Sequence, residues 1–157
     1  MTEIDEIDLK ILRALVANGR ITNNALADEV GLSPSPCWQR VKRLENEGYI
    51  KGYSAQLNNE KMGFSQIAFV EVSLSKHDDK TLQKFADEIA RIPEVLEVHM
   101  VTGGYDFLLK ISIKDIKSYE RFLSKKLYEF PYIQKSHSIF SLNAIKDTGS
   151  ISPIVLT

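Results

Sequence analysis

The sequence predicts an α+β protein of two domains, in which a small helical domain precedes a domain of alternating strands and helices. Two observations lead to this prediction. Up to Gly48 the apolar residues recur three or four positions apart, the spacing that places them on one face of a helix. From Ile67 onward, runs of alternating apolar and polar residues, typical of strands, are separated by runs with helical spacing. The 157 residues, 43% apolar and 26% charged, suffice for two small cores.

The first predicted helix begins near Asp8, whose side chain can cap it, and ends near Ala17. Acidic residues near its start suit the positive end of the helix dipole. Its apolar stripe is Ile11, Leu12 and Leu15, and the stop signal Asn18-Gly19 follows. Together with the next two helices it forms a predicted three-helix domain.

The second and third helices have the pattern of a helix-turn-helix motif. Thr22 can cap a helix that runs through Val30, and Gly31 supplies the turn. Ser33 can cap the third helix, with Pro34 at its first position, where a missing N–H costs nothing. The positions expected to face inward are Ala25, Leu26 and Val30 in the second helix, and Cys37, Val41 and Leu44 in the third.

The opposite face of the third helix is rich in donors suited to phosphates and to base edges in a major groove. It carries Ser35, Gln39, Lys42, Arg43 and Asn46. The net charge of the chain is −1, but the local basic excess, from Arg40, Lys42, Arg43 and Lys51, coincides with this helix. Because this excess is small, we expect several copies to bind DNA together. The alternative is a packed helix pair whose charged face is merely solvated.

Gly48 ends the third helix, and the domain boundary is predicted in the linker that follows a short strand. Residues 49–57 have the composition of a short strand, and residues 58–63 that of a linker. The chain is thus divided into a helix-turn-helix DNA-binding domain (1–52), a hinge strand and linker (53–63) and a second domain (64–157).

The second domain has the predicted order β-α-β-β-α-β, a ferredoxin-like fold. Strands are expected at 67–74, 95–102, 105–113 and 133–142, with Gly103-Gly104 as the turn of a hairpin. One helix contains Leu82 to Ile89, and a second starts at Asp115 or Ser118. The expected inner side of the second helix is Ile116, Tyr119, Phe122, Leu123 and Leu127.

Both helices would cover one face of the sheet, yet apolar residues such as Ile67, Phe69 and Leu108 would lie on the other face. An open apolar face of this size usually marks an interface. The sequence therefore predicts a dimer that forms through the sheet.

Other classes of protein find little support. No apolar run is long enough to span a membrane, and the acidic N-terminus lacks a secretion signal, so a cytoplasmic protein is expected. The single cysteine, Cys37, lies on an apolar helix stripe. His77, His99 and His137 lack the spacing of metal ligands, so no metal and no cofactor are expected. Neither a nucleophile with a base nor a phosphate loop indicates an enzyme.

Four motifs resemble the Lrp/AsnC (feast/famine) family of prokaryotic transcription regulators. These are the segment from Ile7 to Arg20, the segment from Val30 to Glu45 with Gly48-Tyr49-Ile50, Thr102 to Leu108, and Ile145 to Thr148 with Ser152-Pro153. The resemblance covers nearly the whole chain. The pair Gly103-Gly104 and the bulky Trp38 depart from the usual residues of the family.

The resemblance implies a sequence-specific transcription regulator that binds double-stranded DNA and responds to a small molecule, usually an amino acid. It implies homodimers that assemble further, commonly into octamers. The DNA-binding residues are then Ser33, Ser35, Gln39, Arg40, Lys42 and Arg43. The effector-binding residues carried over are Gly103, Gly104, Tyr105 and Asp106, with Ser136 and Ser138 as further candidates on the last strand.

Two alternatives stay open. The protein could package DNA without responding to a metabolite, whereas an enzyme is disfavoured. Asp106 could contact an effector, or its carboxylate could simply accept the N–H groups of its own turn. Tyr105 could equally belong to the core.

Overall fold

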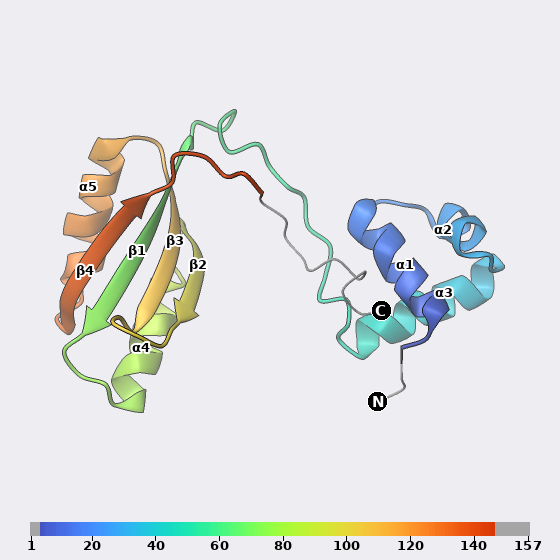
Figure 1. Cartoon of the computed structure of the whole chain (residues 1–157), viewed down its shortest axis with the longest axis horizontal. Coiled ribbons are helices and arrows are strands. Elements are labelled where there is room, and N and C mark those ends of the chain that lie inside the picture. The colour runs from blue at the N-terminus through green and yellow to red at the C-terminus, as the bar shows by residue number, and fades with distance from the viewer. Residues whose placement is uncertain (1–3, 147–157) are drawn as a thin grey trace. The chain divides into compact units, whose positions relative to one another are not determined.

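The computed structural model describes residues 4–146. The chain divides into two compact units, one containing the residues up to Gln56 and the other comprising Leu57–Ile145 (Figure 1). The C-terminal motif predicted at Ile145 to Thr148 and Ser152-Pro153 lies mostly outside the described residues.

The first unit consists of three helices, α1 (Glu6–Ala17), α2 (Asn23–Val30) and α3 (Pro34–Asn46). Helix α1 begins earlier than predicted, because its N-cap is Asp5 and not Asp8. The Asp5 carboxylate accepts the Asp8 backbone N–H at 2.8 Å, and the Asp8 carboxylate accepts the Asp5 N–H at 3.2 Å. This reciprocal capping box satisfies two backbone donors at the helix start.

The predicted helix-turn-helix is confirmed. Thr22 caps α2, Gly31 adopts a left-handed φ of 74° in the turn, and Ser33 occupies the N-cap position of α3 without accepting a side-chain bond. The expectation for Ala25 is wrong, since it is exposed while Ala27 is buried. The buried core is Ile11, Ala14, Leu26, Ala27, Val30, Cys37 and Leu44.

The strand predicted at residues 49–57 is absent from the described chain, where this segment has no regular structure. Tyr53 and Leu57 are 52% and 67% exposed. A strand is stabilised by hydrogen bonds to a neighbouring strand, and residues 4–146 offer this segment no such neighbour.

The second unit confirms the β-α-β-β-α-β order. Its elements are β1 (Gln66–Leu74), α4 (Asp79–Ile89), β2 (Val95–Met100), β3 (Phe107–Ile113), α5 (Ile116–Lys125), the short 3-10 helix η1 (Leu127–Glu129) and β4 (Ile133–Phe140). The strands form one antiparallel sheet with the order β2-β3-β1-β4. Helices α4 and α5 lie on one face of this sheet (Figure 1), and their apolar side chains pack in the same core cluster as those of the strands.

The helix-covered face contains the core of the second unit. Alternate residues of β1, from Ala68 to Leu74, are buried there, as are alternate residues of β3 from Phe107 to Ile113. Phe85 of α4 contacts the Phe107 ring with centroids 4.8 Å apart. Ile116 was expected on the inner side of α5, but it is 61% exposed because it occupies the first position of the helix, on its outer side.

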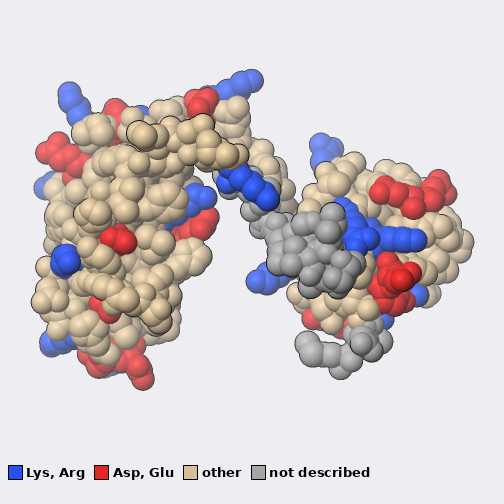
Figure 2. Space-filling model, in the orientation of Figure 1, with Lys and Arg blue, Asp and Glu red and all other residues tan. Residues whose placement is uncertain are grey.

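The other sheet face, which we term the open face, carries apolar side chains as predicted. Phe69 lies opposite Ile139 of β4, and Ile67 and Leu108 are also on this face. Ile139 is 46% exposed. The surface that the second unit turns to the viewer in Figure 2 is mostly uncharged, with a few acidic and basic side chains scattered over it.

Candidate DNA-binding and effector sites

The outward side of α3 matches the predicted donor face in part. Ser33, Ser35, Gln39 and Lys42 are exposed, whereas Cys37 and Leu44 on the other side are completely buried. Trp38, which departs from the family pattern, is 54% exposed. The α3 surface therefore offers hydroxyl, amide and ammonium donors to solvent.

Lys42 has a neighbour on its own helix. Its Nζ lies 2.7 Å from Glu45 Oε2, and the Tyr53 hydroxyl donates to Glu45 Oε1 at 3.1 Å. The hydrogen bond from Lys42 is the main cause that lowers the pKa of Glu45. Since the Lys42 side chain is 48% exposed, such an ion pair contributes little stability and can exchange for a phosphate.

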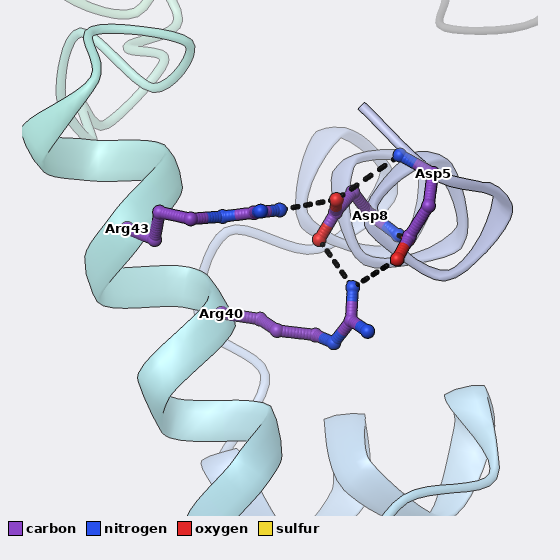
Figure 3. A network of polar contacts seen from close by, with 4 residues as sticks. All are labelled: Asp5, Asp8, Arg40 and Arg43. Carbon is purple, nitrogen blue, oxygen red and sulfur yellow. Dashed lines mark hydrogen bonds and ion pairs between the residues drawn. The ribbon is translucent and has the colours of Figure 1, made fainter. Parts of the chain in front are cut away.

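Unlike Lys42, the two arginines of α3 both point toward the start of α1 (Figure 3). Arg40 Nη1 lies 2.6 Å from Asp5 Oδ2 and 3.0 Å from Asp8 Oδ1. Arg43 donates through Nη2 to the other oxygen of Asp8. The helix period placed Arg43 on the outer face, but its guanidinium is held by α1.

From the sequence, Asp8 is expected only as a helix cap, and its contacts with the two arginines are not predicted. Asp8 is 0% exposed, whereas the Asp5 side chain is 49% exposed. The pKa of Asp5 is lowered to about 2, first by the backbone N–H of Asp8 and then by the hydrogen bond from Arg40. The acidic residues at the chain start pointed to the helix dipole, and no short-range pattern links them to arginines more than thirty residues away.

The predicted hairpin turn lies between β2 and β3, where Gly103 has a φ of 121°. That conformation strains any residue with a side chain, so the backbone itself requires glycine there. Gly103 and Gly104 are both exposed, and a side chain added at either would meet open space. The turn at these two residues is therefore sterically open to a ligand.

Asp106 closes the hairpin onto β1. Its Oδ2 accepts the backbone N–H of Leu74 at 2.7 Å and lies 3.2 Å from Nε2 of His77. The Asp106 N–H donates to the Val72 carbonyl at 2.9 Å. The carboxylate thus accepts a backbone N–H, as one interpretation expected, but from the neighbouring strand and not from its own turn. Oδ1 has no hydrogen-bond partner within residues 4–146.

Three side chains that the sequence did not single out lie near the hairpin. Lys135 Nζ is 4.7 Å from the centroid of the Tyr105 ring, a cation–π contact. Ser73, which pairs with Lys135 across β1 and β4, donates to the Gly104 carbonyl at 3.4 Å. His77 is the third. Only the register of β4 against β1 brings Lys135 to this edge.

Ser136 and Ser138 belong to the other face of β4. The Ser136 hydroxyl lies 3.0 Å from the Tyr128 hydroxyl, and the Tyr119 hydroxyl donates to Ser138. Burial raises the pKa of Tyr119. The structure therefore groups Gly103 to Asp106 with Ser73, His77 and Lys135, and it directs the two serines toward the helix layer.

Other chemistry has few candidates in the part of the chain that the structure describes. No group of three or more His, Cys, Asp or Glu side chains there could hold a metal ion. Cys37 is buried, which raises the pKa of its thiol and keeps it unreactive. Within the same residues, no helix has the length and apolarity needed to cross a membrane.

A helix-turn-helix unit followed by a β-α-β-β-α-β domain is the arrangement of a DNA-binding regulator with a second domain. Comparison with known proteins agrees. Residues 4–51 match the model of a winged helix-turn-helix DNA-binding domain, and residues 67–151 match the Lrp/AsnC ligand binding domain. The chain belongs to the Lrp/AsnC family of transcription regulators, which are not enzymes.

Similar proteins cover nearly the whole chain. The proline dehydrogenase transcriptional activator of Rhizobium radiobacter is 42% identical over 147 residues, 94% of each chain. The leucine-responsive regulatory protein of Escherichia coli is 34% identical over 149 residues, 95% of this chain and 91% of that one. A transcriptional regulator of Neisseria meningitidis, solved as a complex with L-Met, is 37% identical with a TM-score of 0.93, covering 99% of this chain and 100% of that one.

Proposed function

We propose that this protein is a cytoplasmic, sequence-specific DNA-binding regulator whose DNA binding or assembly responds to an amino acid. The observation that carries the proposal is that one chain combines an exposed polar face on α3 with an open hairpin turn next to a partly exposed carboxylate. The first feature suits double-stranded DNA, and the second suits a zwitterion.

The donors proposed to meet DNA are Ser33, Ser35, Gln39 and Lys42, with Arg40 and Arg43 behind them. A Gln side chain can make two hydrogen bonds to adenine in the major groove, whereas a Lys ammonium suits a phosphate.

Gln39→Ala is expected to fold normally and to lose about 1–3 kcal/mol of discrimination between operator and unrelated DNA, because a base contact is removed. Lys42→Ala should instead weaken binding to all sequences and lower the salt slope by about one. Gel-shift titrations at several salt concentrations measure both. Unchanged affinity and unchanged discrimination in both variants would place the DNA-binding face elsewhere.

The proposed effector site consists of Gly103, Gly104, Tyr105 and Asp106. The free oxygen of Asp106 can accept the ammonium group of an amino acid, and backbone N–H groups of the turn can donate to its carboxylate. The L-Met complex of the Neisseria regulator supports an amino acid as the class of ligand. Ser136 and Ser138 would act through the helix layer and not by direct contact with this ligand.

A thermal-shift screen against the twenty amino acids tests this part of the function. A ligand that binds only the folded state, present at a concentration 100 times its Kd, adds about 2.7 kcal/mol to the free energy of unfolding and so raises Tm. We expect one amino acid or a small group of similar ones to raise Tm. If no amino acid changes Tm or DNA binding, the DNA-packaging function without an effector becomes the better description.

The proposed assembly is a homodimer formed through the open face, from which higher oligomers such as an octamer are built. The apolar pairing of Phe69 with Ile139 supplies the surface. Two copies bring two α3 helices to one DNA molecule, which offsets the small positive charge of a single copy.

A further inference from the structure

The carboxylate of Asp8 has an unusual environment for a charged group. It is the one charged residue that is buried within residues 4–146. It accepts the backbone N–H of Asp5 and the guanidinium groups of both arginines, with Arg40 on Oδ1 and Arg43 on Oδ2 (Figure 3). A buried carboxylate is tolerated only when such partners replace water, so both arginines are needed to keep it there.

This cluster joins α1 to α3 at two points. Arg40 and Arg43 lie three residues apart on α3, so their side chains leave the same side of that helix. One carboxylate that holds both of them fixes the rotation of α3 about its axis as well as its distance from α1. The Nε of Arg43 is also buried and has no hydrogen-bond partner among the described residues, so this arginine contacts Asp8 through Nη2.

We propose that Asp8 is a positioning residue for DNA recognition. It holds Arg40 and Arg43 so that α3 presents Gln39 and Ser35 at the angle that sequence reading requires. The arginines then orient the helix and do not read bases. This inference rests on the proposed function, in which the outward face of α3 binds DNA.

If the arginines bind DNA themselves, the effect of substituting Asp8 should have the opposite sign. If Arg40 and Arg43 read DNA directly, the carboxylate competes with DNA for them. Neutralising Asp8 would then free both guanidinium groups for base edges and strengthen discrimination between operator and unrelated DNA. If Asp8 positions α3, neutralising it lets the helix move and weakens sequence discrimination. The sign of one measurement therefore separates the two roles.

The test compares Asp8→Asn with Glu6→Gln in the full chain. Glu6 is exposed, is two residues away on the same helix, and loses the same charge. The probes are a duplex enriched from a randomised library by the unsubstituted protein and poly(dI-dC). Fluorescence anisotropy at several salt concentrations gives the affinity ratio of the two probes and the salt slope, and circular dichroism gives the folded fraction.

We expect Asp8→Asn to lower the affinity ratio about 5–150-fold, the equivalent of the 1–3 kcal/mol that a misplaced base contact costs. The salt slope should not change, because no phosphate contact is lost, and Glu6→Gln should keep the parent ratio. A ratio for Asp8→Asn that is equal to or higher than that of the parent overturns the inference. If the unsubstituted protein binds every duplex with the same affinity as poly(dI-dC), the proposed function itself is overturned.

Arg43→Lys provides the answer if Asp8→Asn does not fold. Lysine keeps the charge but lacks the guanidinium Nη2 through which Arg43 donates to Asp8. Its discrimination is measured on duplexes that each carry one altered base pair. We expect discrimination to fall at all positions of the site, as for a misoriented helix. A loss confined to one base pair would show that Arg43 reads that base, and it would overturn the positioning role.

Discussion

Ile139→Lys is expected to convert the protein to monomers and to lower its DNA affinity about 10²–10⁴-fold, the gain that linking two binding modules provides. Ile139 is already 46% exposed in the single chain, so lysine there leaves the fold intact. In the proposed dimer the same position would be covered, and an ammonium group buried without a partner is strongly unfavourable. Light scattering after gel filtration measures the mass, and gel-shift titration measures the affinity.

Ile116→Lys is the matched control, since Ile116 is a 61% exposed isoleucine on the outer side of α5. It should keep the parent mass and the parent affinity. Residues 64–157 alone should also dimerise, because the open face belongs entirely to that unit. A dimeric Ile139→Lys protein would show that the subunits associate through another surface.

Much of the fold could be predicted because its signals are local. Gly31 between two apolar helical patterns indicates a helix-turn-helix, and Gly103-Gly104 between two alternating runs indicates a hairpin. The failures have physical causes of longer range. The strand expected at residues 49–57 lacks a partner strand among residues 4–146, and hydrophobic spacing cannot tell whether a partner exists. Asp5 and Asp8 are both good caps, and only the capping-box geometry selects Asp5.

The candidate sites were less predictable than the fold. Exposure of Gln39 and Lys42 follows from the helix period. The direction of Arg43 does not, because a long side chain turns toward whichever charge lies near it, and Asp8 is distant in sequence. Lys135 reaches Tyr105 through strand register, which a single sequence does not specify.

Asp106→Ala is expected to abolish the response to the amino acid identified by the screen, while Asp106→Asn separates the two roles of this carboxylate. The Asp106 side chain accepts the Leu74 N–H at 2.7 Å, so alanine removes a hydrogen bond of the hairpin together with the charge. Asparagine retains an oxygen for Leu74 but loses the negative charge that would attract an ammonium group. If the charge binds the effector, both variants lose the response; if the carboxylate only closes the hairpin, asparagine keeps it.

The size of the effect follows from linkage. A ligand shifts an assembly only by its difference in affinity for the two states, typically about 1–3 kcal/mol, or about 5–150-fold in DNA affinity. Operator half-sites must match the spacing of two α3 helices, about 34–36 Å or multiples of it, so a changed assembly alters which DNA is bridged without changing α3.

Operator titrations with and without the amino acid measure this shift, with Asp79→Asn, an exposed acid of α4, as the control. Ligand-free affinity should be equal in all four proteins. If Asp106→Asn and Asp106→Ala both respond at the ligand concentration of the parent, the effector binds at a site other than Gly103–Asp106.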